Sequence, residues 1–182
     1  LFRSQLLYHS GAIARPGRVD SGDTVTDAMA LERARGITIR AAATAYTWRG
    51  SKINILDTPG HMDFFAEVER ALGVLDGAVL VISAKEGVQH QTRVIFQMLR
   101  RLGIPTLLFV NKVDRLGVDL PAVLEQIRAR LSPEICLLQA VSGAGAAVPQ
   151  LRALPLAALA DGLIEADEVL AESFLRDEPL AE

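Results

Sequence analysis

The stretch Asp57-Thr58-Pro59-Gly60-His61 combines a carboxylate with a glycine. A carboxylate at the end of a strand can hold Mg²⁺, usually through water. Gly60 has no side chain, so a phosphate could approach its backbone and accept its N–H. The alternative is a structural turn, because Asp and Thr cap helices and Pro-Gly pairs form turns.

A second polar stretch, Asn111-Lys112-Val113-Asp114, could recognise a base. The Asp114 carboxylate can accept two N–H groups from guanine, at N1 and at the 2-amino group, whereas adenine does not offer that pair. A buried carboxylate left without its donors is costly, so this contact discriminates between the bases. Asn111 can bridge neighbouring loops, and the aliphatic stem of Lys112 can cover the base. The alternative is a polar loop that carries a helix cap.

A third stretch, Glu32-Arg33-Ala34-Arg35-Gly36-Ile37-Thr38-Ile39, supplies a hydroxyl. The Thr38 side chain could coordinate Mg²⁺ when a γ-phosphate is present, and its release on hydrolysis would be an order–disorder switch. The alternative is a charged surface loop that leads into a strand.

The elements that must position these residues follow from the apolar pattern. Two alternating runs joined by a polar turn predict a hairpin. Continuous apolar runs separated by helical periodicity predict parallel strands with helices on both faces. The predicted strands are 44–48, 52–56, 78–82, 106–110 and 134–139, and the predicted helices are 64–75, 91–102 and 121–131. The fold class is therefore α/β, a three-layer doubly wound and mostly parallel sheet, with ligands expected at the carboxyl ends of the strands.

Together the three stretches resemble the translational GTPases, in the same order along the chain. The ERxRGIT pattern matches residues 32–38, the first switch; DTPGH matches residues 57–61, the second switch; and NKxD matches residues 111–114, the guanine-specificity loop. Within that family the sequence is most similar to the tetracycline-resistance ribosomal protection proteins, with elongation factor G as the alternative. The similarity spans residues 6–139, and the stretches that carry the narrower resemblance are 7–11, 61–64, 83–89 and 102–106.

The resemblance implies a Ras-like P-loop NTPase G domain that binds GTP or GDP with Mg²⁺ and is activated by the ribosome. It implies that Thr38 and Asp57 act at the metal, that residues 57–61 lie at the phosphates, and that Asn111, Lys112, Val113 and Asp114 bind the base. It also implies that His61 is the catalytic residue, which positions the attacking water once the ribosome has moved it into place.

The phosphate-binding pattern Gly-x-x-x-x-Gly-Lys-[Ser/Thr] does not occur in the 182 residues. Ser83-Ala84-Lys85 has the letters of the family's other guanine loop, but it follows a different strand. We therefore expect a G domain that is incomplete at both ends, over residues 1–141, followed by a linker and helical extension at 142–182. Helices are predicted at 151–160 and 164–175. The alternative is a fragment that keeps this fold without binding nucleotide.

The amino-acid composition limits the classes of partner and the cellular compartment that we expect. Lys and Arg number 19 against 22 Asp and Glu, and this weakly acidic balance gives no support to a broad nucleic-acid surface. Apolar runs have the length of strands rather than the roughly 20 residues of a membrane span. The single cysteine, Cys136, excludes an internal disulfide and suits a reducing compartment; its apolar neighbours predict a buried, inert thiol. We expect a cytoplasmic monomer that binds neither a membrane nor a specific DNA sequence.

Overall fold

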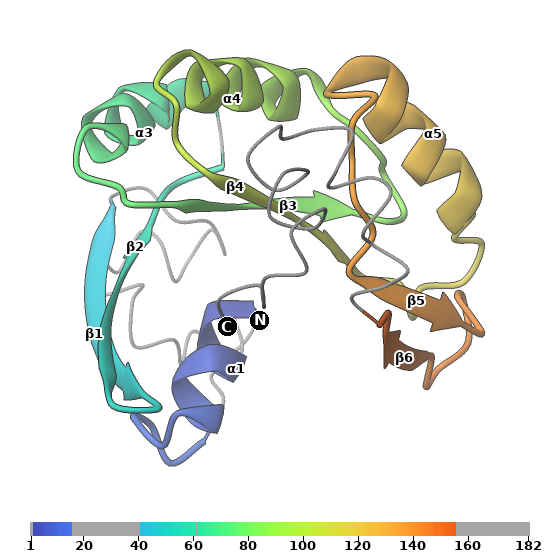
Figure 1. Cartoon of the computed structure of the whole chain (residues 1–182), viewed down its shortest axis with the longest axis horizontal. Helices are drawn as coiled ribbons and strands as arrows, with labels where there is room; N and C mark the ends of the chain where they lie inside the picture. The colour runs from blue at the N-terminus through green and yellow to red at the C-terminus, as the bar shows by residue number, and fades with distance from the viewer. Residues whose placement is uncertain (1, 16–40, 61, 156–182) are drawn as a thin grey trace, which may run out of the picture. The chain divides into compact units, whose positions relative to one another are not determined.

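The chain divides into two units, Leu1–Asp76 and Gly77–Glu182, coloured from blue to green and from green to red in Figure 1. The computed structural model describes residues 2–15, 41–60 and 62–155. Thr38, His61 and the predicted helix at 164–175 lie outside the described residues.

The first unit contains the predicted hairpin. β1 (Ala42–Trp48) pairs antiparallel with β2 (Ser51–Asp57), from Ala42 opposite Asp57 to Trp48 opposite Ser51. The two turn residues, Arg49 and Gly50, both have positive φ, at 48° and 84°. Two-residue loops with positive φ at both positions match the right-handed twist of the strands, which explains the tight connection. The hairpin prediction is confirmed.

The described part of this unit also contains the helices α1 and α3 and a short 3₁₀ helix. α1 (Phe2–His9) was not predicted; it buries Leu7, which is 2% exposed. β2 is followed by a 3₁₀ turn, η2 (Met62–Phe64), and then by α3 (Phe65–Leu72), which confirms the helix predicted at 64–75. α3 buries Val68, Ala71 and Leu72, which share one face because helical neighbours recur three and four residues apart.

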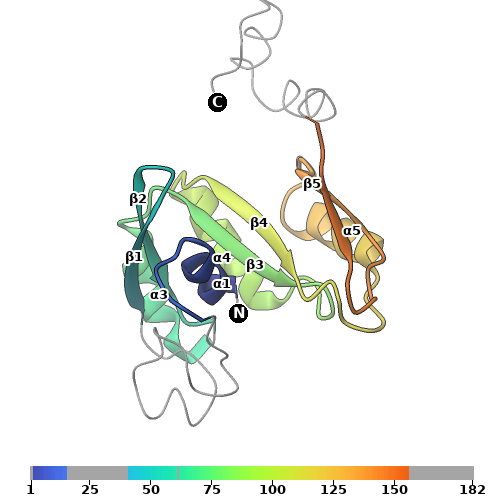
Figure 2. The same cartoon turned by 90° about the horizontal axis from the view of Figure 1, so that it is seen from below.

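The second unit is organised on a parallel strand pair. β3 (Ala78–Ser83) lies beside β4 (Thr106–Asn111), in register from Ala78 opposite Thr106 to Ser83 opposite Asn111 (Figure 2). Parallel strands need a crossover connection, and α4 (His90–Arg101) supplies it. Both strands and the helix confirm the predictions. Because the two strands run in the same direction, their carboxyl ends meet at one edge.

The core of the second unit forms between these strands and α5 (Leu120–Arg130), the helix predicted at 121–131. Its buried members are Ile82, Val88, Val123 and Ile127. Apolar side chains on the opposite face of the strands are more exposed: Val79, Val81 and Leu107 are each 44–45% exposed. In the described part of this unit, helices therefore cover one face of the strand pair rather than both.

The predicted strand at 134–139 is wrong. The Ile135 N–H donates to the Pro133 carbonyl at 3.1 Å, a tight turn that an extended strand does not contain, and the Ile135 side chain packs on the core instead. The strand begins later, as β5 (Gln139–Ser142).

The helix predicted at 151–160 is wrong over residues 151–155, and its remaining residues lie outside the described part of the chain. β6 (Gln150–Ala153) pairs antiparallel with β5, and the residues between them form the turn of a second hairpin. Only β3 and β4 pair in parallel among the described strands, because both other pairs are hairpins.

Candidate functional site

The first predicted site loop begins where β2 ends. Asp57 is the last residue of β2, and its Oδ2 atom is buried. Pro59 is fully buried, whereas Gly60 is exposed and has open space where a Cβ would stand. Pro59 therefore anchors the loop while the backbone at Gly60 stays accessible to a ligand.

Helix capping does not explain Asp57 and Thr58. The N-cap of α3 is Phe64, which makes no side-chain cap hydrogen bond. The half-buried Thr58 stands well before that helix. Neither residue therefore caps α3, and a turn remains as the structural alternative.

The second predicted site loop begins where β4 ends. Asn111 is the last residue of β4, and its Oδ1 accepts the backbone N–H of Lys112 at 2.8 Å. Lys112 has a φ of 60°, in the left-handed region that non-glycine residues rarely adopt. The chain therefore turns sharply after β4, and the next residues, Val113 and Asp114, are half-buried and exposed respectively.

Helix capping does not explain Asp114 either. α5 is capped by Asp119, whose Oδ1 accepts the Ala122 N–H at 3.0 Å. Because Asp119 performs that structural task, the exposed carboxylate of Asp114 is available to a ligand.

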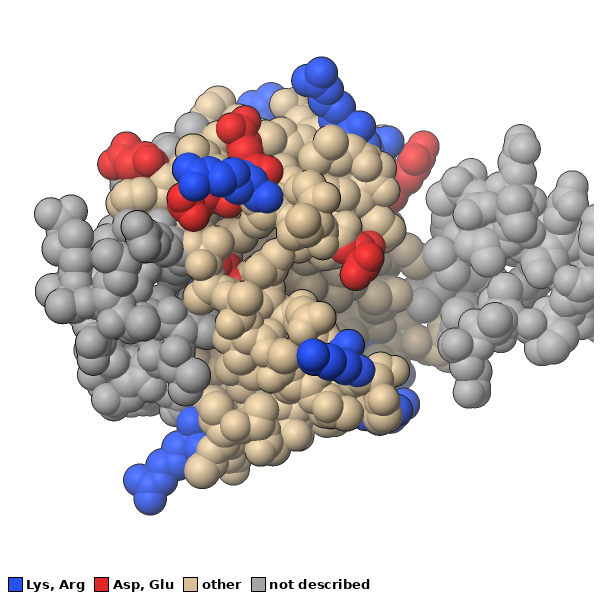
Figure 3. Space-filling model, turned by 90° about the vertical axis from the view of Figure 1, so that its left-hand side faces the viewer, with Lys and Arg blue, Asp and Glu red and all other residues tan. Residues whose placement is uncertain are grey.

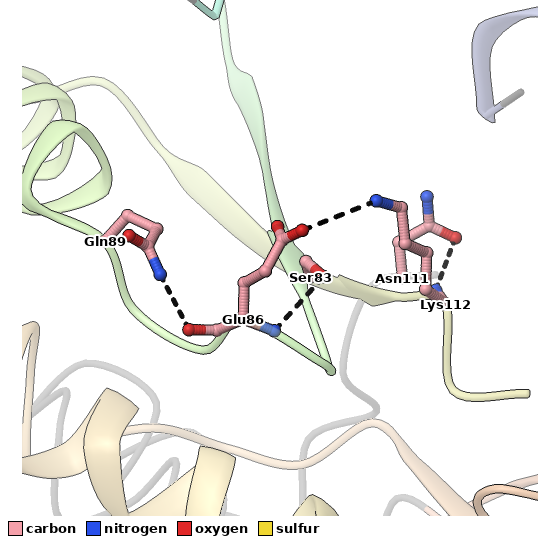
Figure 4. A network of polar contacts seen from close by, with 5 residues as sticks. All are labelled: Ser83, Glu86, Gln89, Asn111 and Lys112. Atoms are coloured by element: carbon pink, nitrogen blue, oxygen red, sulfur yellow. Dashed lines mark hydrogen bonds and ion pairs between the residues drawn. The ribbon is translucent and has the colours of Figure 1, made fainter. Parts of the chain in front are cut away.

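A polar network that the sequence analysis did not assign to the site surrounds the second loop (Figure 4). Lys112 Nζ lies 3.9 Å from Glu86 Oε1, an ion pair between two exposed side chains. Glu86 belongs to the loop after β3, and Ser83, the last residue of β3, lies opposite Asn111. The signal that could have found Glu86 is its place just beyond a strand's carboxyl end, where functional residues gather in α/β folds.

The predicted site residues fall into two groups. Asp57, Thr58, Pro59 and Gly60 belong to the first unit, and residues 111–114 belong to the second. Thr38 and His61 lie outside the described residues, so the metal pair of Thr38 and Asp57 and the catalytic role of His61 stay predictions.

The described residues include one of the two predicted metal ligands, Asp57. Among them there is no cluster of three His, Cys, Asp or Glu side chains that could hold a metal ion. The buried Oδ2 of Asp57 fits Mg²⁺, which keeps several waters and binds through one or two carboxylates plus phosphates.

Surface charge is mixed. On the face shown in Figure 3, Lys and Arg are scattered with Asp and Glu among uncharged residues. Two ion pairs link close neighbours on helices, Arg70 with Glu67 at 3.2 Å and Arg128 with Glu125 at 3.0 Å.

Cys136 is partly buried, which corrects the prediction of a buried thiol. In the described part of the chain, no helix is long and apolar enough to cross a membrane.

A family model and a solved structure both match this chain over most of its length. Residues 2–174 match the family model described as "Elongation factor Tu GTP binding domain". A crystal structure of a protein from Thermus thermophilus superposes with a TM-score of 0.81 at 29% identity, over 98% of this chain and 31% of that one. These matches confirm the predicted α/β fold class.

Similar curated proteins share one description. Tetracycline resistance protein TetW of Butyrivibrio fibrisolvens is 52% identical over 97% of this chain and 27% of its own length. TetO of Streptococcus pneumoniae is 59% identical over 75% of this chain and 21% of its own. The oxytetracycline resistance protein of Streptomyces rimosus is 57% identical over 84% and 23%. The chain thus spans about a quarter of the length of these relatives.

Proposed function

The chain belongs to the family of elongation factor Tu GTP binding domains, and from that premise we propose that it is part of the GTP-binding domain of a ribosome-activated GTPase. We further propose that the complete protein protects the ribosome from tetracycline. The observation that carries the nucleotide assignment is the loop after β4, where Asp114 is exposed and α5 has a different cap, Asp119.

Guanine recognition follows from the chemistry of this loop. We assign to the Asp114 carboxylate the two N–H groups of guanine, to Lys112 and Val113 the covering of the base, and to Asn111 the support of the turn. The Asn111 side chain already performs that support, because its Oδ1 accepts the Lys112 N–H at 2.8 Å.

Phosphate and metal binding fall to the loop after β2 in this proposal. The Gly60 N–H is accessible to a phosphate oxygen, with Thr58 and Pro59 holding the turn. Mg²⁺, when bound, would offset part of the charge of the phosphates. Asp57 and Thr38 would hold it, and His61 would position the attacking water.

Ribosomal protection is favoured over a translocation factor by the names of the relatives, which describe tetracycline resistance proteins. Expression of the complete protein in a tetracycline-sensitive bacterium should raise the inhibitory concentration of the drug. Translocation during peptide synthesis, without protection from tetracycline, would favour the elongation factor G alternative.

We also propose that residues 142–182 extend the G domain of residues 1–141 and do not form a separate domain. The Gly145 N–H donates to the Val113 carbonyl at 2.8 Å, which ties the turn of the second hairpin to the base-recognition loop. The complete protein acts in this proposal as a cytoplasmic monomer, with the ribosome and guanine nucleotide as its partners.

Replacing Asp114 tests the assignment. In the complete protein, Asp114→Asn should weaken GTP binding roughly a hundredfold or more, because two charge-assisted hydrogen bonds are lost. The same change should shift preference toward xanthosine triphosphate, whose C2 carbonyl accepts from an amide. Competition between the two nucleotides for a fluorescent GDP analogue measures both effects.

Asp119→Asn is the matched control, because Asn caps helices about as well as Asp. It should leave both affinities unchanged. Unchanged guanine selectivity in Asp114→Asn would contradict the proposed function.

A further inference from the structure

The loop after β3 runs beside the base-recognition loop. We call residues 84–89 the bracing loop and residues 111–117 the recognition loop. Ser83 lies opposite Asn111 in the parallel ladder, and the Ala84 N–H donates to the Asn111 carbonyl at 2.8 Å. The two loops therefore leave the sheet together, at its carboxyl edge.

One side chain crosses from the bracing loop to the far end of the recognition loop. Lys85 Nζ donates to the Leu116 carbonyl oxygen at 3.0 Å, although the two residues are 31 positions apart. The next residue leaves room for this contact: a Cβ at Gly117 would stand 2.9 Å from Lys85 Nζ. Gly117 also has a φ of 76°, so a side chain there would be strained as well as in the way.

Besides Lys85, the recognition loop is held by the turn of the second hairpin, whose Gly145 N–H donates to the Val113 carbonyl at 2.8 Å, and by bonds within the loop. The Leu116 side chain is 87% exposed and so gives no packing anchor. Local backbone bonds of 3.2 and 3.3 Å join Arg115 to Lys112 and Val118 to Arg115. A charge-assisted hydrogen bond from Lys85 is stronger than such neutral bonds.

Contacts with α5 and within the loop hold the backbone of the bracing loop, and so they fix the position from which the Lys85 side chain extends. Val88 is 4% exposed in the core, and its N–H donates to Gln126 Oε1 at 3.1 Å. Arg130 donates to the Val88 carbonyl at 3.2 Å, and the Gln89 amide donates to the Glu86 carbonyl at 2.7 Å (Figure 4). Side chains of α5, together with Gln89 at the start of α4, thus fix the loop that carries Lys85.

We propose that Lys85 is a positioning residue for guanine binding, which acts by holding the Leu116 carbonyl and so preorganises the loop that carries Asp114. It touches no nucleotide in this scheme. Because preorganisation lowers the cost of ordering a loop on binding, its loss weakens affinity without altering the hydrolysis step. The inference rests on the proposed function, since it concerns the same nucleotide.

Three variants of the complete protein test it. Lys85→Met keeps the aliphatic stem and removes the donor, and it should raise the Kd for GDP roughly fivefold. Lys85→Arg restores a charged donor and should bring the Kd back to within about twofold of the unsubstituted protein. Lys52→Met, in the exposed part of β2, is the matched control and should change nothing.

The kinetic constants KM and kcat distinguish a positioning role of Lys85 from a catalytic one. Lys85→Met should raise KM for GTP while leaving ribosome-stimulated kcat unchanged, because only binding is affected. A fall in kcat at unchanged KM would overturn the inference, as would a Kd equal to that of the unsubstituted protein or a failure of Lys85→Arg to restore binding.

Amide hydrogen exchange in the nucleotide-free protein gives a readout independent of binding. Residues 113–117 should exchange faster in Lys85→Met than in Lys52→Met, and equal rates would overturn the inference. Unsubstituted protein that binds no guanine nucleotide would instead contradict the proposed function, so the two failures are distinguishable.

Discussion

At the scale of single residues, the proposed function assigns the imidazole of His61 to GTP hydrolysis and not to nucleotide binding. We expect His61→Ala to lower ribosome-stimulated GTP turnover of the complete protein by roughly a hundredfold, the loss typical of a group that positions or activates a nucleophile. The Kd for GTP should stay within about twofold, since His61 is not assigned to the ground-state complex. Turnover with ribosomes and nucleotide titration without them measure the two effects.

His90→Ala is the matched control, because His90 is exposed at the start of α4 and has no assigned role. It should hydrolyse GTP at the rate of the unsubstituted protein. Equal turnover by His61→Ala and His90→Ala would remove His61 from the mechanism.

Sequence reasoning was sufficient for residues whose position depends on a local pattern. Asp57 and Asn111 end strands that their apolar neighbours predict, and the structure confirms both positions. It was insufficient for Lys85, because its contact with Leu116 spans 31 residues and arises only when β3 and β4 pair. Nor could spacing assign the cap of α5 to Asp119 rather than Asp114, since both carboxylates precede the helix.

At the scale of elements, the turn of the second hairpin supports the recognition loop from a second direction. The Gly145 N–H donates to the Val113 carbonyl at 2.8 Å, next to the predicted base contact. Gly145→Pro removes this donor, and we expect it to raise the Kd for GDP of the complete protein about threefold to fivefold. Competition with a fluorescent GDP analogue measures the change.

Gly143→Pro controls for distortion of the turn. Gly143 and Gly145 have similar positive φ values, 70° and 86°, so proline is equally incompatible with both backbones. The Gly145 N–H reaches the recognition loop, whereas Gly143 bonds within the turn, accepting the Ala146 N–H at 3.0 Å. Equal loss of affinity in the two variants would show that turn shape, and not the bond to Val113, matters.

Elements with strong periodicity were predictable, and those that depend on a distant partner were not. The helix α3 repeats its buried positions at helical spacing, which predicted the helix, although it ends at Leu72 and not at the predicted residue 75. The strand β5 instead requires β6, which lies at the start of a Leu- and Ala-rich segment, residues 151–160, that favours a helix when considered alone. Pairing between the two overrides that local preference, because each strand satisfies the backbone groups of the other.

At the scale of the whole molecule, the chain spans 27% of TetW and 21% of TetO, so the activity that those names describe belongs to proteins much longer than these 182 residues. The family match over residues 2–174 includes the residues that the proposed function assigns to the base and to the metal. The matched residues do not contain the pattern Gly-x-x-x-x-Gly-Lys-[Ser/Thr], because it occurs nowhere in the 182 residues. That loop cradles phosphates with backbone N–H groups and a lysine.

The isolated 182-residue chain should therefore bind no GTP at micromolar concentrations. In the proposed function, Asn111, Lys112 and Asp114 are assigned only to the base, while Thr38 and Asp57 are assigned to the phosphates through a metal. Each missing charge-assisted hydrogen bond to the triphosphate removes on the order of 1.5–3 kcal/mol, so that losing several lowers affinity by many powers of ten. Titration calorimetry with GTP and Mg²⁺, at micromolar concentrations of the chain, measures this directly. Heat from micromolar binding would contradict the prediction and would mean that the residues after β2 and β4 hold the nucleotide without a phosphate loop.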